Sequence, residues 1–310
     1  MSLVAPTGDL HLKSVLIATD FSDASDKAMR HGLAIARHYG ARLYLVHVVS
    51  SLGFTLAGPG AINEAAEVVR RDARQLQDRL TQSGALAGVR HEAIVLQGDV
   101  CETLERVIRQ ENVELVVIGT HARRGLGKLL LGSVAEQIFL RTECLVLTVG
   151  PGSLRDSPVG SKRPIRPFVF ATSFSEASLH ALPYAISAAN HFGTRLVLLH
   201  VAPAITMPEG VGRPTADDVV QAREKSHAAC IRQLTELTLH APKLAIEPEF
   251  LVEFGSPSEK ILQAANDLKA DAMILGLHRS THISTAAHMP WATAYEVVCG
   301  ACCSVLTVRN

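Results

Sequence analysis

Glycine, basic and hydroxyl residues that suit phosphate binding gather in one segment, VVIGTHARRGLGKLLLGSVAEQIF, which begins at Val116. Gly119 and Gly132 would let the backbone approach a phosphate closely, and Ser133 follows directly. Three basic residues stand between the glycines: Arg123, Arg124 and Lys128. Their charge favours phosphate oxygens, so the segment predicts a phosphate-binding loop, with a solvated charged loop as the equal alternative.

The two best-known glycine-rich templates both fail on this segment. In a Walker loop fitted over residues 122–129, Ala122 replaces the first glycine and Leu129 replaces the hydroxyl that binds magnesium. A dinucleotide fingerprint that starts at Gly125 has Leu130 where its third glycine must allow close packing. The loop must therefore be of another kind.

The chain contains an internal repeat, and this segment lies in its first copy. VLIATDFSDAS at residues 15–25 recurs as FVFATSFSEAS at 168–178, and ARLYLVHVV at 41–49 recurs as TRLVLLHVA at 194–202. ELVVIGTHARR and CLVLTV of the first half are likewise matched by DAMILGLHRST and CSVLTV of the second. A period this long indicates two homologous globular domains rather than a short solenoid repeat.

We expect the first domain at residues 1–150 and the second at 167–310, with a linker rich in proline and glycine at 151–166. The 30 basic and 30 acidic residues balance, which argues against non-specific nucleic-acid binding. The first residues lack the pattern of a signal peptide, and no apolar run reaches the roughly 20 residues of a membrane span. We therefore expect a soluble, cytoplasmic protein without nucleic-acid or membrane partners.

Short runs rich in Val, Ile and Leu alternate with longer amphipathic stretches inside each copy. In the first copy the runs are SVLIAT, RLYLVHVV, HEAIVLQ, ELVVIGT and CLVLTV. A helical pattern follows the first run, and Ser22 is placed to cap it. Alternation of this kind predicts an α/β fold of two tandem, doubly wound, five-stranded parallel-sheet domains of Rossmann-like type.

In such sheets, ligands bind beyond the carboxyl ends of the strands, where the strand order reverses. Asp20 follows the first predicted strand, Gly119 ends the fourth, and Gly132 with Ser133 opens a helix whose N–H groups favour phosphate. A carboxylate at Asp20 suits a ribose or the polar edge of adenine better than the phosphates. The alternatives are a helix cap for Asp20 and a plain helix start for Gly132.

Together these features resemble the universal stress protein family. The resemblance rests on the spacing G-x2-G-x9-G-[ST], on Asp20 inside DFS, on HV at the end of the second strand and on LLLGSVAE. It covers essentially the whole chain as a tandem pair. It implies ATP as the cofactor, with magnesium left open, and domains that pair through their last strands as an intramolecular pseudo-dimer or in a homodimer.

The family's nucleotide contacts, carried over residue by residue, fall on Asp20, Val48, Ile118, Gly119, Ala122, Arg123, Gly132, Ser133 and Val134. Ala122 departs from the pattern, because the family has glycine there. If the backbone needs a positive φ at this position, the methyl group costs about 1 kcal/mol. Such a cost would weaken binding roughly fivefold without abolishing it.

The second copy departs further from the family pattern. Ser173 stands for Asp20, Arg279 for Ala122, Met289 for Gly132 and Pro290 for Ser133. Proline has no backbone N–H to offer a phosphate, and methionine is bulky. We therefore predict that the second domain binds no ATP in the family manner.

Histidines occur in two informative places. His47 and His200 end matching strands in both copies, so we expect a shared structural role in which each ring bonds nearby backbone. His278, His282 and His288 lie close in sequence, yet the segment is a poor helix, so a metal site is the lesser interpretation.

Three of the six cysteines cluster near the end of the second copy, at Cys299, Cys302 and Cys303. The first two have C-x-x-C spacing, but a strand follows and a second ligand pair is missing. Buried, inert thiols are therefore favoured over a redox or metal role.

These inferences predict a stress-response protein whose first domain binds an adenine nucleotide and which acts as a nucleotide-dependent regulatory or interaction module on an unknown protein partner. A nucleotide-free interaction scaffold is the first alternative, in which Ala122 marks a lost site. A slow ATPase is the second. No obvious general base stands beside the loop, so no catalytic residue is assigned.

Overall fold

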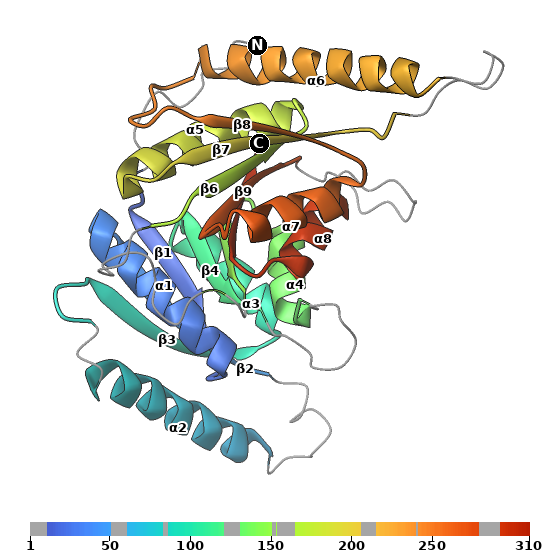
Figure 1. Ribbon diagram of the computed structural model, residues 1–310. Helices are drawn as coiled ribbons and strands as arrows, with labels where there is room; N and C mark the ends of the chain where they lie inside the picture. Colours follow the sequence, from blue (N-terminus) through green and yellow to red (C-terminus); the bar gives the residue numbers. More distant parts are fainter. Residues whose placement is uncertain are drawn as a thin grey trace. The chain divides into compact units, whose positions relative to one another are not determined.

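The computed structural model describes residues 11–50, 61–82, 86–120, 131–150, 153, 165–205, 215–239, 241–278 and 292–310. These residues form two compact units, and the division along the chain falls between residues 164 and 165. In each unit, five strands run parallel in one sheet with helices outside it, as Figure 1 shows. The predicted fold of two tandem doubly wound α/β domains is confirmed.

In the first unit, strands and helices alternate along the chain. They are β1 (Ser14–Ala18), α1 (Asp23–Tyr39), β2 (Arg42–Ser50), α2 (Ala61–Gln82), β3 (His91–Gly98), α3 (Val100–Gln110), β4 (Leu115–Gly119), α4 (Ser133–Arg141) and β5 (Leu145–Val149). The strand order is β3-β2-β1-β4-β5, so it reverses between β1 and β4. Both α2 and α3 pack on β2 and β3, and α3 also packs on α4. Right-handed crossovers therefore set α1 and α2 on one face and α3 and α4 on the other.

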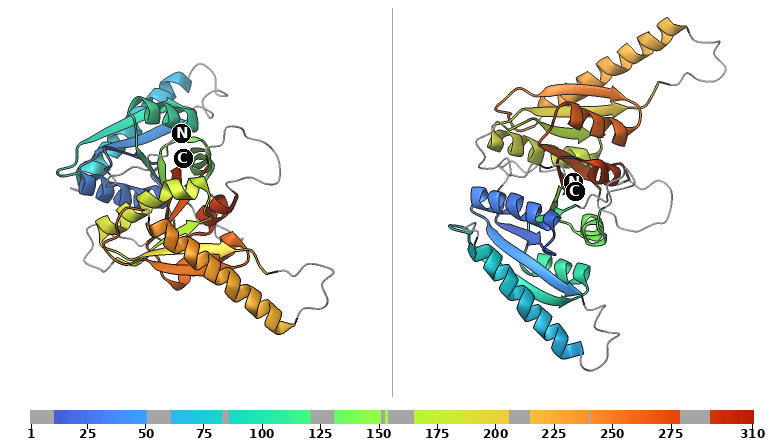
Figure 2. Two further views of the ribbon diagram at one scale, coloured as in Figure 1. Left: turned by 90° about the horizontal axis from the view of Figure 1, so that it is seen from above. Right: turned by 60° about the horizontal axis from the view of Figure 1, so that its bottom comes forward.

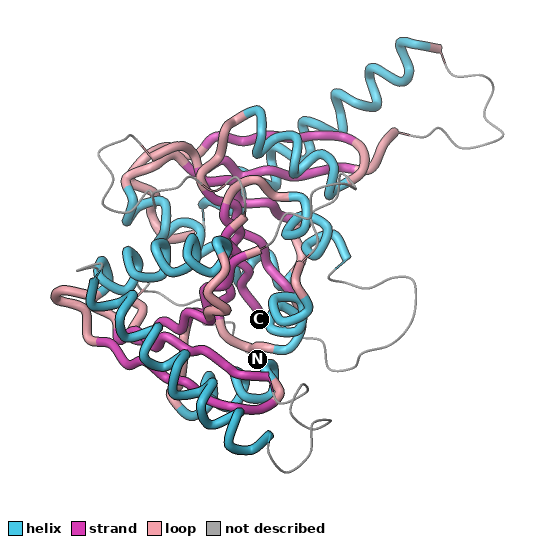
Figure 3. Tube along the Cα trace, turned by 90° about the horizontal axis from the view of Figure 1, so that it is seen from below, coloured by secondary structure: helices cyan, strands magenta, loops and turns pink. Residues whose placement is uncertain are grey.

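The second unit repeats this plan. Its elements are β6 (Phe168–Thr172), α5 (Glu176–Phe192), β7 (Leu196–Ala202), α6 (Ala216–Leu239), β8 (Glu249–Phe254), α7 (Pro257–Asp267), β9 (Ala272–Leu277), α8 (Ala292–Gly300) and β10 (Ser304–Arg309). The order β8-β7-β6-β9-β10 again reverses beside the first strand, and Figure 3 shows the strands of each sheet side by side. One end of α6 projects beyond its own sheet (Figure 2), and only Cys230 and Leu234 are buried along this helix.

The first helix of each unit begins and ends with the same local signals. The Ser22 side chain accepts a hydrogen bond from the backbone N–H of Ser25 at 3.2 Å and caps α1, as the sequence predicts. Gly40 ends this helix in the left-handed region, with φ of 63°. Ser175 and Gly193 do the same for α5. Glycine suits these C-terminal positions because it adopts a positive φ without strain.

The cores lie between each sheet and its helices. Every residue of β5 and β6 is buried, and the largest fully buried side chains include Leu16, Phe139 and Phe170. Burying a side chain of this size contributes about 2 kcal/mol each, which outweighs the weak local preferences of short strands. Among the helices of the described ranges, none is both long and apolar enough to cross a membrane.

Candidate functional site

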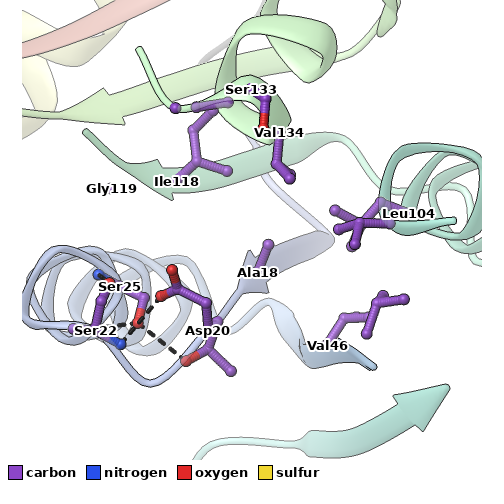
Figure 4. Close-up of a pocket in the computed structure, with 15 residues that line it drawn as sticks. Ala18, Asp20, Ser22, Ser25, Val46, Leu104, Ile118, Gly119, Ser133 and Val134 are labelled. Atoms are coloured by element: carbon purple, nitrogen blue, oxygen red, sulfur yellow. Dashed lines mark hydrogen bonds between the residues drawn. The ribbon is translucent and has the colours of Figure 1, made fainter. Parts of the chain in front are cut away.

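A cavity of about 240 Å³ opens at the carboxyl ends of the strands of the first unit. It lies where the strand order reverses between β1 and β4, the position at which open α/β sheets bind ligands. Figure 4 shows side chains from several elements pointing into it. The lining is Ala18, Thr19, Asp20, Ser22, Ser25, Val46, Val48, Val100, Leu104, Ile118, Gly119, Gly132, Ser133, Val134 and Ala135.

Most of the residues carried over from the family meet in this cavity. They are Asp20, Val48, Ile118, Gly119, Gly132, Ser133 and Val134. Ala122 and Arg123 lie outside the described residues, as do Arg124 and Lys128. The described members thus come to one place from β2, β4, the start of α4 and the turn after β1. Their contact with a nucleotide stays a prediction.

Asp20 lies in a tight turn between β1 and α1. Its Oδ1 accepts a hydrogen bond from the backbone N–H of Ser22 at 3.0 Å, drawn as a dashed line in Figure 4. The next residue, Phe21, has φ of 64°, and its N–H donates to Oγ1 of Thr19 at 3.1 Å. The helix cap is therefore Ser22, while the exposed carboxylate of Asp20 stabilises the turn before it.

His47 and His200 share the structural role that the sequence predicts. Nδ1 of His47 lies 2.8 Å from the carbonyl oxygen of Thr19, and Nδ1 of His200 lies 2.9 Å from that of Thr172. In the first unit the other ring nitrogen also has a partner, because Nε2 of His47 lies 3.3 Å from Oδ2 of Asp72. Each histidine therefore ties the second strand of its unit to the turn after the first.

Gly119 has a packing role that the sequence alone does not reveal. A Cβ at this position would lie 2.2 Å from the carbonyl oxygen of Ala24 in α1. Gly276 in the second unit meets the same obstacle, with a Cβ 2.2 Å from the carbonyl oxygen of Ala177. Both units need glycine here, because a residue without a side chain lets the helix and the strand approach closely.

The start of α4 forms one wall of the cavity. Gly132 is the N-cap, with φ of −62° and ψ of 152°, and it makes no side-chain capping bond. Ser133 is the first helical residue rather than the cap, and its side chain is exposed. The first backbone N–H groups of a helix have no partner within it, so this wall presents donors and the positive end of the helix dipole.

The sequence prediction included Val48, Ile118 and Val134 but missed other apolar residues of the lining. Val46 lies two residues before Val48 on β2 and therefore shares its face of the sheet, which period-two alternation could have revealed. Val100 and Leu104 come from the first turns of α3, one helical turn apart. Their approach to the cavity depends on how α3 packs, so no local signal identifies them.

The corresponding turn of the second unit carries hydroxyl groups in place of the carboxylate. Oγ of Ser173 donates to Oγ of Ser175 at 3.0 Å and lies 3.3 Å from Oγ of Ser178. Arg279, Met289 and Pro290 lie outside the described residues.

One prediction about the cysteines of the second unit is wrong. Cys302 is exposed and Cys299 is partly so, which contradicts their predicted burial, because they lie at and just after the end of α8. Burial raises the pKa of the Cys303 thiol to about 12, which suits an inert side chain. His282 and His288 lie outside the described part of the chain, within which no group of three or more potential ligands could hold a metal ion.

Comparison with known proteins supports the fold and identifies the family. The model of the universal stress protein family matches residues 11–150 and again 164–309. A universal stress protein of Thermus aquaticus is 31% identical over 138 residues, which cover 44% of this chain and 98% of that protein. One from Mycolicibacterium smegmatis is 24% identical over 271 residues, 85% of this chain and 86% of its own.

A solved structure shows the tandem fold over nearly the whole length. The universal stress protein from Archaeoglobus fulgidus superposes with a TM-score of 0.66 at 20% identity and covers 97% of each chain. At this identity the likeness concerns the fold. Because the family model matches both halves, the chain belongs to the universal stress protein family, as a tandem member with two domains.

Proposed function

We propose that the first unit binds ATP in the cavity at the ends of β1 and β4. The observation that supports this most is the meeting of Asp20, Val48, Gly119 and Ser133 around one cavity, since the family pattern assigns nucleotide contacts to these positions. The cavity volume of about 240 Å³ is small for a ligand site, where roughly 300–1,000 Å³ is usual. It suits the base and ribose, with the phosphates extending toward the start of α4.

The chemistry of the lining fits such a ligand. Val46, Val48 and Leu104 offer apolar contact to the faces of a base. The carboxylate of Asp20 is a hydrogen-bond acceptor for ribose hydroxyls. The N-terminus of α4 offers backbone donors to phosphate oxygens. The lining therefore combines apolar and polar groups, as the base, the ribose and the phosphates of a nucleotide require.

Occupancy of this site would regulate the protein rather than drive a reaction. A bound nucleotide stabilises whichever conformation of the protein binds it best, and a protein partner that distinguishes the conformations would respond. The second unit, with Ser173 in place of Asp20, would be an empty structural partner.

The experiment identifies the small molecules released when freshly purified protein is denatured, by mass spectrometry. Gly132→Glu places a carboxylate at the N-cap of α4, where it would repel phosphate. Ser256→Glu is the matched control, because Ser256 is the N-cap of α7 in the second unit and also makes no side-chain capping bond.

The expected result is one adenine nucleotide per chain in the wild type and in Ser256→Glu, and none in Gly132→Glu. A wild type that releases no nucleotide, and that binds none from millimolar ATP, would refute the proposal. The scaffold that acts without nucleotide would then be the better description.

A further inference from the structure

His47 lies where β2, α2 and the turn after β1 meet. Its Nδ1 is 2.8 Å from the carbonyl oxygen of Thr19, and its Nε2 is 3.3 Å from Oδ2 of Asp72. Its ring packs against the ring of Phe21, with 4.5 Å between the centroids. His47 and Asp72 are only 9% and 8% exposed, so this pair is nearly excluded from water.

These contacts hold the residues on both sides of Asp20. Thr19 precedes it and receives the hydrogen bond from His47, while Phe21 follows it and packs against the same ring. Phe21 adopts a positive φ, which is unfavourable for a residue with a Cβ and persists only where contacts maintain it. The direction of the Asp20 carboxylate therefore depends on two neighbours that His47 fixes.

The second unit repeats this arrangement around a different central residue. Nδ1 of His200 is 2.9 Å from the carbonyl oxygen of Thr172, and its ring lies 4.4 Å from that of Phe174, whose φ is 58°. Ser173 stands between them, where the first unit has Asp20. The histidine, the threonine and the phenylalanine are thus requirements of the turn in both units.

The helix beside the histidine distinguishes the two units. Along α2, Asp72 and Leu76 are buried one helical turn apart, and along α6 the buried residues at the same spacing are Cys230 and Leu234. This pattern aligns Asp72 with Cys230. A thiol packs in such a place as a small apolar group, whereas a buried carboxylate is costly unless it is paired. The carboxylate is therefore not needed to form the turn.

We propose that Asp72 is a positioning residue of the nucleotide site, which acts through His47 on the turn that carries Asp20. The two ring nitrogens of His47 lie between the Thr19 carbonyl and the Asp72 carboxylate, so the carboxylate helps to fix the orientation of the ring. Nε of Arg71, 3.1 Å from Oδ1, holds the other carboxylate oxygen.

The difference between the units explains why the carboxylate occurs in one only. The first unit is the one expected to hold a nucleotide, and its histidine has a partner at both ring nitrogens. The second unit keeps the same turn with a thiol at the aligned position of α6, and we predict that Ser173 has no nucleotide to contact. Because Asp20 is the group that would contact the nucleoside, this inference rests on the proposed function.

The test uses the full chain and two substitutions of Asp72. Asp72→Asn keeps the shape and removes the charge, and Asp72→Cys installs the residue that the second unit accepts at the same place. Nitrogen-15 NMR reports the hydrogens on the His47 ring, and hydrogen exchange reports the Phe21 amide, with the Phe174 amide as an internal reference. Calorimetry then measures the affinity for ATP.

We expect the nitrogen-15 signals of the His47 ring to differ between the wild type and both variants, because Nε2 loses its contact with the carboxylate. The Phe21 amide should exchange faster, and ATP should bind roughly fivefold more weakly, which is the usual effect of losing one hydrogen bond. The unfolding midpoint should change little for Asp72→Cys. His200→Gln, which removes the equivalent ring from the second unit, should leave the ATP affinity unchanged.

The outcomes separate this role from the proposed function. If the wild type binds ATP and both Asp72 variants bind it equally well, the positioning role is refuted and the nucleotide site stands. If the wild type binds no ATP, both are refuted, and any faster exchange at Phe21 describes a contact that serves the fold alone.

Discussion

The turn after β1 and the turn after β6 are built from the same parts around different centres. Both have a phenylalanine with positive φ, a histidine bonded to a threonine carbonyl, and a serine that caps the next helix. The first turn has Asp20 at its centre and Asp72 behind its histidine, whereas the second has Ser173 and a helix whose aligned residue is Cys230. Both turns form, although only the first carries these two carboxylates.

Two copies in one chain therefore act as an internal control. A residue found at the same place in both copies, such as Gly119 with Gly276, serves the fold even when it lines the cavity. A residue present in one copy only is the better candidate for ligand binding. By this criterion Asp20 is a stronger site residue than Gly119, although the family pattern names both.

The largest expected effect concerns the paired glycines. Gly119→Ala and Gly276→Ala would each drive a Cβ to 2.2 Å from a backbone oxygen of the neighbouring helix. Because backbone cannot yield cheaply, we expect each variant to destabilise its own unit by about 3 kcal/mol. Urea unfolding measures this. If Gly276→Ala proved as stable as the wild type, the two glycines would not share a packing role. Gly119 would then serve a purpose that is specific to the first unit.

A smaller effect is expected from the residues that differ at the centre of the turn. Asp20→Asn keeps an oxygen that can accept from the Ser22 N–H but removes the charge, so we expect about tenfold weaker ATP binding and little loss of stability. Titration calorimetry measures the affinity. Ser173→Asp should leave one site per chain, and two sites would show that the rest of the second site is intact.

The departure at Ala122 predicts a gain in affinity. If the missing glycine costs about 1 kcal/mol, Ala122→Gly should bind ATP roughly fivefold more tightly than the wild type. The same titration checks it. An unchanged affinity would mean that position 122 needs no positive φ when the nucleotide binds.

The smallest effect is expected from the helix caps. Ser22→Ala and Ser175→Ala each remove one hydrogen bond to a backbone N–H, so each should cost about 1 kcal/mol of unfolding free energy in its unit. Thermal unfolding of the pair measures both. A much smaller cost at Ser175 would show that the neighbouring hydroxyls of Ser173 and Ser178 replace the lost bond.

The sequence predicts those features that depend on local pattern or on repetition. Apolar runs identify the strands, Ser22 predicts the start of α1, and the recurrence of histidine in both copies predicts its bond to backbone. Asp72 could not be recognised, because α2 contains several charged residues and only tertiary packing decides which one is buried. The positive φ of Phe21 could not be predicted either, because phenylalanine is not a residue type that readily adopts it.

The residues that line the cavity also differ in whether the sequence predicts them. Its polar end follows from family spacing at Asp20 and Ser133, whereas its apolar wall at Val100 and Leu104 depends on the docking of α3. The burial of Cys302 was predicted wrongly, because an apolar sequence context does not fix exposure where a helix gives way to a strand.

Strand β2 has cavity-lining residues on one face and a residue with a structural role on the other. Val46 and Val48 line the cavity, while His47 between them points the other way and secures the turn. In β7, His200 makes the same bond to backbone in a unit that we predict to bind no ATP. After gene duplication, one side of such a strand is free to drift while selection for stability acts on the other. A domain that no longer binds its ligand can therefore remain well folded, and later substitutions can give it a new specificity.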